Sequence, residues 1–225
     1  MIDETEEAIR TKWHNIFAAV LREWLEPVNI TVSPEEPLTA EPQRIDVLLL
    51  KHNNGPLTPE QFCRLADGLR DSKAQHLLLE FKYTESFSKD YIKQTMGYET
   101  AYRTRKKMKE DQVDSFLLCS QSPRPETLRD FGYTLTEHAG VYRNDNPVLA
   151  GTLILSLNDL SNEPHNIPLK IFASKMQEKR NAFEAINNDA LQGMSIDLEF
   201  TLEGLQEILF DFLMKEKNIW LILKN

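Results

Sequence analysis

The residues best suited to chemistry lie in the segment His76–Ser86, where an acid and a base interrupt an apolar run. Three leucines precede Glu80, and Phe81, Lys82 and Tyr83 follow it. An unpaired charge in a protein interior costs several kcal/mol, so a chain that places one there normally provides a partner or a role for it. Alternate residues of a strand share one face, so Glu80 and Lys82 are expected to point the same way, about 6.6 Å apart.

A second acid, Asp46, lies in the similar apolar run Arg44–His52. If the two runs pair as neighbouring strands, Asp46 and Glu80 come close together. Two close carboxylates repel each other, and one takes up a proton unless a cation lies between them. Because Mg²⁺ is normally held by one or two carboxylates with waters and substrate phosphates, the pair predicts a divalent-metal site. Lys82 would then hold a scissile phosphate or a nucleophilic water.

Composition alone makes a bare Glu-x-Lys expected about once in a chain with this much Glu and Lys, so context must decide its meaning. A relaxed version, Asp71-Ser72-Lys73, lies in a polar connection without an apolar run. Simpler interpretations of the motif also exist. Glu80 and Lys82 would form an exposed ion pair on an edge strand, and Asp46 would pair with Arg44 or cap a helix.

The elements expected around these residues alternate in the order of an α/β layered core. A first helix is expected at residues 3–26, where apolar residues recur at helical spacing before Pro27. The remaining helices are expected at 58–75, from Ser86 or Ser88 to about 110, and at 125–132, 169–186 and 201–217. Strands are expected at 28–32, 44–52, 76–83, 114–120, 133–142 (a strand or a hairpin) and 151–160. A Pro- and Glu-rich loop is expected at 33–42, and a short apolar tail at 218–224.

Gln94 and Tyr98 are four residues apart in the long helix, so they share one of its faces. This Q-x-x-x-Y spacing, after an Asp and a Glu-x-Lys on two successive strands, resembles the PD-(D/E)xK nuclease superfamily in its RecB-type form. Within that superfamily it resembles the recombination-promoting nuclease and transposase-like branch. The resemblance covers roughly residues 1–145. Two departures are that Ile45 replaces the Pro of the superfamily's name, and that a helix is inserted between Asp46 and Glu80.

The resemblance implies a restriction-endonuclease-like core, a central mixed β-sheet flanked by helices, over residues 1–158. A mainly helical extension over residues 159–225 would either pack on that core or stand apart. The implied activity is metal-dependent hydrolysis of DNA phosphodiester bonds. Asp46, Glu80 and the main-chain carbonyl of Phe81 would bind Mg²⁺ or Mn²⁺.

The resemblance also implies roles for residues beyond the metal ligands. Lys82 would orient or help to deprotonate the attacking water, Gln94 would hold that water or a phosphate oxygen, and Tyr98 would buttress the site or contact the DNA backbone. Arg105 is a further candidate for contact with DNA, although the basic run 103–109 also suits a solvated helix end. Gln94 and Tyr98 also fit an ordinary half-buried helix face.

The superfamily often carries one more acid or histidine in its first helix, and this chain leaves that choice open. The candidates are Glu6, Glu7, His14 and Glu23. His14 considered alone is more typical of a packed or exposed residue. The other four histidines, at positions 52, 76, 138 and 165, form no recognisable cluster in the sequence.

Composition sets broader limits on what this chain does. Its 225 residues carry a net charge of −9, which argues against coating nucleic acid non-specifically but not against a nuclease, because a bound cation dominates the local field. Cys63 and Cys119 show no zinc-site spacing and are expected in the core. That cysteine usage, without a membrane-spanning run, favours a cytoplasmic protein.

Three functional alternatives remain at this point. The first is an active nuclease, and the second is a catalytically silent nuclease-like fold that serves as a DNA-binding or assembly module. The third is a carboxylate-based hydrolase of a small phosphorylated substrate, which predicts a closed pocket. The apolar helical segment 205–214 would complete the core or support a homodimer.

Overall fold

A seven-stranded mixed sheet forms the middle layer of the protein. The computed structural model describes residues 4–37, 44–51, 55–83 and 87–187. The strand order is β1-β2-β3-β4-β7-β6-β5; β3, β4 and β7 run parallel, and the other neighbouring pairs are antiparallel. The strands are β1 (Ile30–Pro37), β2 (Arg44–Lys51), β3 (His76–Lys82), β4 (Val113–Cys119), β5 (Tyr133–Leu135), β6 (Val141–Asn144) and β7 (Thr152–Ser156).

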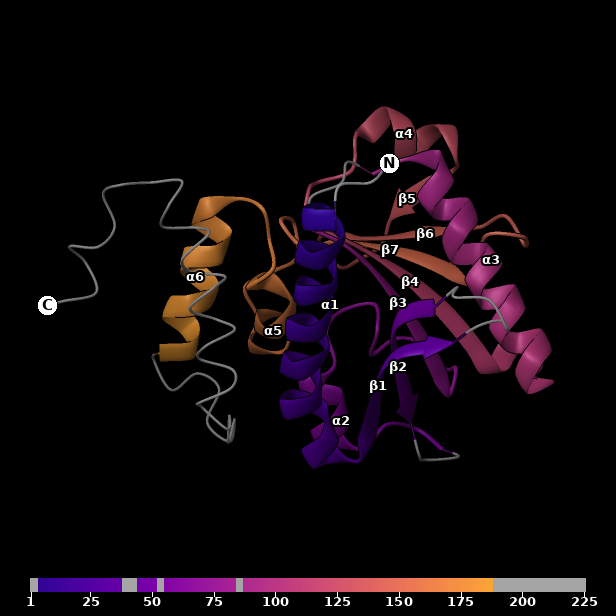
Figure 1. Ribbon diagram of the computed structural model, residues 1–225, viewed down its shortest axis with the longest axis horizontal. Helices are drawn as coiled ribbons and strands as arrows, with labels where there is room; N and C mark the ends of the chain where they lie inside the picture. The colour runs from indigo at the N-terminus through magenta and orange to yellow at the C-terminus, as the bar shows by residue number, and fades with distance from the viewer. Residues whose placement is uncertain (1–3, 38–43, 52–54, 84–86, 188–225) are drawn as a thin grey trace, which may run out of the picture.

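Helices cover both faces of this sheet (Figure 1). They are α1 (Glu4–Leu25), α2 (Pro59–Arg64), α3 (Lys89–Lys106), α4 (Pro125–Asp130), α5 (Ile167–Lys170) and α6 (Met176–Asn187), with short 3-10 turns at Glu26–Val28, Glu110–Gln112 and Pro164–Asn166. α1 and α3 lie on opposite sides of the strands (Figure 1). The predicted α/β class, with a mixed sheet flanked by helices, is therefore confirmed.

Two-sided coverage explains the near-continuous apolar run of β3. Leu77, Leu79 and Phe81 belong to the cluster that packs under α1, whereas Leu78 belongs to a cluster under α3 that includes Tyr102. A strand covered on both faces must be apolar at odd and even positions alike. Charged residues in such a strand are therefore buried, whichever face they take.

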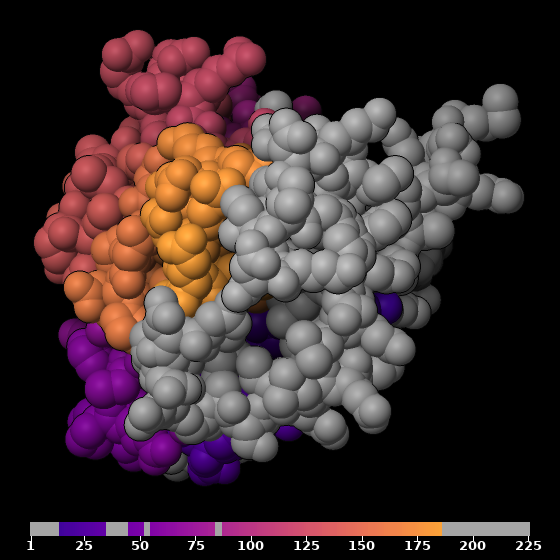
Figure 2. Space-filling model, turned by 90° about the vertical axis from the view of Figure 1, so that its left-hand side faces the viewer, coloured from indigo at the N-terminus to yellow at the C-terminus, as the bar shows by residue number. Residues whose placement is uncertain are grey.

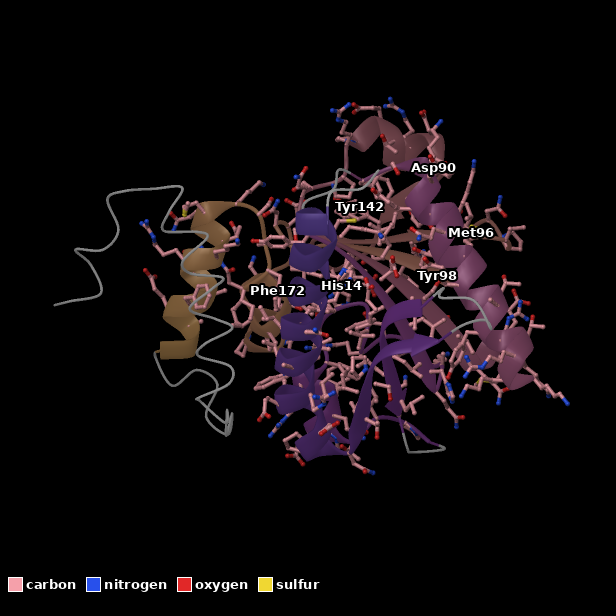
Figure 3. All side chains as sticks on the ribbon, viewed as in Figure 1. His14, Asp90, Met96, Tyr98, Tyr142 and Phe172 are labelled. Atoms are coloured by element: carbon pink, nitrogen blue, oxygen red, sulfur yellow. The ribbon has the colours of Figure 1, made fainter. Side chains whose placement is uncertain are left out.

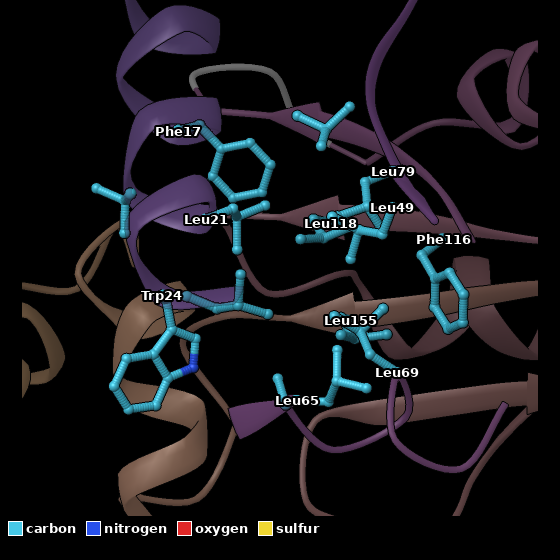
Figure 4. Packing of buried hydrophobic residues seen from close by; sticks show 14 of the residues in the cluster. Phe17, Leu21, Trp24, Leu49, Leu65, Leu69, Leu79, Phe116, Leu118 and Leu155 are labelled. Atoms are coloured by element: carbon cyan, nitrogen blue, oxygen red, sulfur yellow. The ribbon is translucent and has the colours of Figure 1, made fainter. Parts of the chain in front are cut away.

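The core under α1 is built on aromatic and aliphatic contacts (Figure 4). Phe17 of α1 stacks on Phe81 of β3, with ring centroids 4.5 Å apart and planes 13° apart. Phe172 meets both rings edge to face, at 5.2 Å and 5.5 Å. Offset stacking and edge-to-face contacts are the favoured arrangements of aromatic rings. This group fixes the end of β3 that carries the charged residues.

The described part of the C-terminal extension packs on the same core. Ile167, Leu169, Phe172 and Ala182 are buried in the cluster that contains the α1 side chains. Figure 2 shows α6 in orange on the face turned toward the viewer. The expected helix at 201–217 and the apolar tail at 218–224 lie outside the described residues.

Several predicted boundaries differ from the observed ones. The Pro- and Glu-rich segment begins as part of β1, which pairs with β2 as far as Pro37 opposite Arg44. β1 is an edge strand, and an edge strand tolerates Pro because one side of it needs no donor. The helix expected at 58–75 ends at Arg64 in the structure, and Gly68 has a positive φ of 81°.

The long helix and the cysteines show further differences from the prediction. α3 begins after Ser88, whose side chain makes no capping hydrogen bond, and ends where Lys107 takes a left-handed conformation. Cys119 is buried as predicted, but Cys63 is exposed, so the prediction that both cysteines lie in the core was wrong for one of them. No helix among the described residues is both long and apolar enough to cross a membrane.

Candidate functional site

Asp46 lies where the pairing of β2 and β3 ends. The antiparallel ladder places Val47 opposite Leu79, as the sequence predicted for these two runs. One residue further along, the Asp46 carboxylate accepts a hydrogen bond from the main-chain N–H of Phe81, with Oδ2 2.8 Å from the nitrogen. A side chain thus replaces the main-chain partner at the point where the ladder ends, and it fixes an acid there.

Glu80 and Lys82 form a buried ion pair on the β3 strand. The Lys82 ammonium lies 2.8 Å from Glu80 Oε1, and the two residues are only 7% and 3% exposed. β3 lies between β2 and β4, not at an edge. The simpler interpretation of an exposed edge-strand pair is therefore wrong.

The charge of Glu80 is only partly balanced. Burial first, and then the neighbouring Asp46 carboxylate, raise the pKa of Glu80 to about 7, although Lys82 and His14 act in the opposite direction. Its second oxygen, Oε2, is buried and makes no hydrogen bond. A buried acceptor without a donor is unusual in a native interior, because it costs about 1–3 kcal/mol. Two close carboxylates with one unsatisfied oxygen are a donor set that suits a divalent cation.

The first helix contributes His14 to this group. His14 Nδ1 lies 3.2 Å from Asp46 Oδ1, and its ring meets Phe81 edge-on with centroids 6.5 Å apart. Figure 3 labels His14 on α1. Of the two first-helix candidates whose side chains the structure describes, His14 and Glu23, His14 is the one that contacts an acid of the site. Glu23 lies more than two turns further along α1, and the side chains of Glu6 and Glu7 lie outside the description.

One face of α3 closes the site from the other side (Figure 3 labels Tyr98). Gln94 Nε2 donates a hydrogen bond to the Tyr98 hydroxyl, as the four-residue spacing allows. Burial, and then the negative charge of Glu80, raise the pKa of Tyr98. The predicted Q-x-x-x-Y pair is thus brought close to the buried carboxylates.

Tyr91, one turn before Gln94 on the same helix face, was missed as a site residue. The Lys82 ammonium lies 4.5 Å from the centroid of the Tyr91 ring, within range of a cation–π contact. The sequence signal was the i, i+3 spacing from Tyr91 to Gln94. Because a tyrosine at that spacing is equally typical of an ordinary helix contact, its type alone could not identify it.

Arg105 lies apart from the buried group, on the exposed part of the last α3 turns. It borders a shallow surface hollow together with Lys93 and Thr104. Within the basic run, Arg103 is engaged by Glu99, with Nε 2.7 Å from Oε1. Arg105 therefore lies on the surface and not among the buried residues of the site.

Two histidines that the sequence left unconnected do meet in the structure. His165 Nε2 lies 2.8 Å from Asp67 Oδ1, and His138 Nδ1 lies 3.7 Å from the same oxygen. Asn166 donates a further hydrogen bond to Asp67. The prediction that the histidines form no cluster was wrong for these two. It could not be corrected from the sequence, because His138 and His165 lie about 70 to 100 residues from Asp67 in the chain.

The candidate metal ligands of the site are the Asp46 and Glu80 carboxylates. Within the described ranges, no group of three or more His, Cys, Asp or Glu side chains is arranged to hold a metal ion. Asp46 and Glu80 supply two side-chain carboxylates, and the Phe81 carbonyl is the third donor that the family resemblance implies. Such a set leaves positions for water and substrate oxygens, as Mg²⁺ sites commonly do.

A comparison with protein-family models found no matching family, and searches of curated proteins and of solved structures found no match.

Proposed function

We propose that the protein is a metal-dependent nuclease that hydrolyses DNA phosphodiester bonds, built on a restriction-endonuclease-like core. The observation that carries the proposal is the buried Glu80 carboxylate, which faces Asp46 and has one oxygen without a hydrogen bond. A fold that needed only stability would gain by replacing these charges with apolar groups. Their presence beside Lys82, Gln94 and Tyr98 supports a catalytic use.

The residues that would hold Mg²⁺ or Mn²⁺ are Asp46, Glu80 and the main-chain carbonyl of Phe81. A bound divalent cation supplies Lewis acidity and lowers the pKa of a bound water. Asp46 is already oriented for this purpose, because the Phe81 N–H and His14 each fix one of its oxygens. His14 is a further candidate for this set, either as a ligand or as the group that orients Asp46.

Lys82 would act on the water and on the phosphate. Its ammonium is held between Glu80 and the face of Tyr91, so its position is set by two independent contacts. A fixed positive charge beside the scissile phosphate stabilises the negative charge that develops in the transition state. Gln94, held by Tyr98, would orient the water or a phosphate oxygen. Arg105 would contact the DNA backbone from the surface.

Plasmid cleavage with Mg²⁺ or Mn²⁺ tests this proposal. Lys82→Ala and Asp46→Ala are each expected to lower the cleavage rate about 100-fold or more, the size of loss seen when one transition-state contact is removed. Lys175→Ala, which removes an exposed lysine that pairs with Asp159, is the matched control and is expected to cleave normally. Equal activity in all four proteins would exclude the assignment.

A second candidate function is a silent nuclease-like module that binds DNA or assembles with a partner. The observation that favours it is the Lys82–Glu80 contact, because a cation of the protein itself already neutralises the acid that a metal would need. Calorimetry with Mn²⁺ separates the two functions. A folded protein that binds DNA in a mobility-shift assay, but neither binds Mn²⁺ nor cleaves, would support the silent module.

A further inference from the structure

A second cavity opens at the opposite end of β2 from Asp46. Asp46 lies near the start of the strand and Lys51 at its end, about 16 Å further along. The cavity has a volume of about 580 Å³, and Lys51, Phe62, Arg70, Asp71, Ser72 and Lys73 are among its lining residues. It includes the Asp-x-Lys segment 71–73, which the candidate nuclease site does not use. Its volume falls within the range of small-molecule sites, about 300–1,000 Å³.

Arg70 is buried beside this cavity with unused hydrogen-bonding capacity. Its side chain is 10% exposed, and its Nε donates to the main-chain carbonyl of Leu65 at 2.9 Å. Its Nη2 is buried and makes no hydrogen bond. The guanidinium also lies over the Phe62 ring, 4.6 Å from the centroid, which fixes its plane. An oriented guanidinium in the cavity wall supplies a fixed positive charge beside a bound phosphate, although its unpartnered Nη2 is itself covered.

Lys51 adds a second, partly buried cation. Its ammonium donates to the main-chain carbonyl of Ser72 at 2.8 Å, and an ammonium can donate three hydrogen bonds. Burial lowers the pKa of Lys51, with the Asp114 carboxylate acting in the opposite direction. Ser72 is itself held, because its hydroxyl donates to Asp114 and accepts from the Ala74 N–H. The wall of the cavity is thus rigid where Lys51 meets it.

The residues that line the cavity carry more positive than negative charge, although the whole chain carries −9 and two further acids, Asp67 and Asp114, lie behind Arg70 and Lys51. Lys51, Arg70 and the exposed Lys73 face a single lining acid, Asp71. Asp71 is already engaged, because its Oδ2 accepts from the Gly68 N–H at 3.0 Å and lies 3.3 Å from His138 Nε2. A cavity lining with more cations than acids is the pattern of an anion site.

We propose that this cavity binds the phosphate group of a nucleotide-sized ligand. Arg70 and Lys51 would hold the phosphate, and Lys73 would complete its neutralisation at the mouth. Phe62, which is 46% exposed, offers a ring for stacking of an attached base. Free phosphate, a nucleotide and the phosphorylated end of a nucleic acid strand share this chemistry. The proposal does not depend on nuclease activity.

Calorimetric titration of the full chain in EDTA tests the proposal, because EDTA prevents binding through a metal at the other site. The probes are inorganic phosphate, deoxyadenosine monophosphate and deoxyadenosine. We expect saturable binding of the first two, tighter for the nucleotide, and none for the nucleoside. Equal affinity for nucleoside and nucleotide, or no saturable binding of phosphate and nucleotide, would overturn the proposal.

Variants test the assigned residues. Lys73→Glu changes only an exposed side chain and is expected to weaken phosphate and nucleotide binding about tenfold, or about 1.4 kcal/mol. Lys175→Glu, the same change at an exposed lysine that pairs with Asp159, is the control and should have no effect. Unchanged binding after Lys73→Glu would overturn the proposal. Phe62→Ala should weaken the nucleotide more than inorganic phosphate, because it removes the stacking ring as well as the contact that orients Arg70. An equal effect on both ligands excludes base stacking.

The source of the phosphate is distinguished by a further comparison. A single-stranded oligonucleotide with a 5′-phosphate is titrated against the same oligonucleotide without it. If the phosphorylated strand binds more tightly than the mononucleotide, and Lys73→Glu removes the difference, the ligand is a nucleic acid end. If the 5′-phosphate makes no difference while the mononucleotide binds, the ligand is a free nucleotide.

Discussion

The raised pKa of Glu80 predicts how the stability of the metal-free protein changes with pH. A carboxyl group whose pKa is about 7 in the folded protein, against an ordinary value of 4.5, takes up a proton on folding between those two pH values. The free energy of unfolding must therefore fall as pH rises from about 4.5 to about 7, and then level off. At about 1.4 kcal/mol per pH unit, the contribution of this one group to that fall is about 3 kcal/mol.

Glu80→Gln removes the titrating group and keeps an oxygen that can accept the hydrogen bond from Lys82. The glutamine leaves Lys82 without its charge partner, so the absolute stability of the variant is less informative than its pH dependence. Urea unfolding in EDTA at several pH values from 4.5 to 8 gives the difference between wild type and variant. That difference cancels titrating groups that lie apart from Glu80, such as His165.

The expected result is that wild type loses about 3 kcal/mol relative to Glu80→Gln across this window. Glu163→Gln, at an exposed glutamate, is the control and should follow the wild type. A difference that stays constant with pH, or that grows in favour of wild type as pH rises, would refute the reasoning about Glu80.

Adding Mn²⁺ in place of EDTA in the same unfolding experiment tests whether Glu80 binds the metal. If Glu80 holds the metal, Mn²⁺ at pH 8 should stabilise the wild type by about 2.7 kcal/mol when its concentration is 100 times the dissociation constant. Glu80→Gln should gain far less. Equal stabilisation of both proteins would place any bound metal elsewhere.

Three further predictions concern the support of the site. Phe81→Ala should lower the free energy of unfolding by about 3–5 kcal/mol in urea, because the ring is 1% exposed and stacks in the core. Gly140→Ala should lower the free energy of unfolding by about 1–3 kcal/mol, since φ is 76° and a Cβ would lie 2.6 Å from a main-chain nitrogen. Its control is Gly97→Ala, which has open space around the Cβ and should not destabilise the protein. Tyr91→Leu should lower the cleavage rate and Tyr91→Phe should preserve it, because phenylalanine keeps a ring face toward Lys82; equal rates would dismiss the cation–π contact.

The sheet could be read from the sequence because apolar runs and their bounding turns are local signals. β2, β3 and β4 lie within a residue or two of their predicted limits. The end of β1 could not be read, because whether a strand tolerates Pro34 depends on its edge position, which is a property of the assembled sheet. The early end of α2 could not be read for a similar reason. The main-chain N–H of Asp67, just beyond the helix, donates to the side chain of Asn166, which is distant in the sequence.

The approach of Asp46 to Glu80 could be predicted because strand pairing and the two-residue period fix it. The choice of His14 among four first-helix residues could not, since it depends on how α1 is rotated about its axis over the sheet. The packing of buried α1 side chains, such as Phe17 on Phe81, sets that rotation. The position of Tyr91 over Lys82 likewise depends on the placement of α3, which residue type does not determine.

Asp46 has a structural role that must be separated from its proposed catalytic role. The N–H of Phe81 lies where the ladder ends, and it would be buried without an acceptor if Asp46 did not provide one. Asp46→Ala therefore removes a metal ligand and also leaves a buried donor unsatisfied, at a cost of about 1–3 kcal/mol.

Asp46→Asn keeps an oxygen that can accept this hydrogen bond but loses the charge that a divalent cation needs. We expect Asp46→Asn to unfold in urea close to wild type and to lose cleavage as fully as Asp46→Ala. An asparagine variant that cleaves normally would show that Asp46 is structural only, and would assign the loss in Asp46→Ala to the unsatisfied N–H.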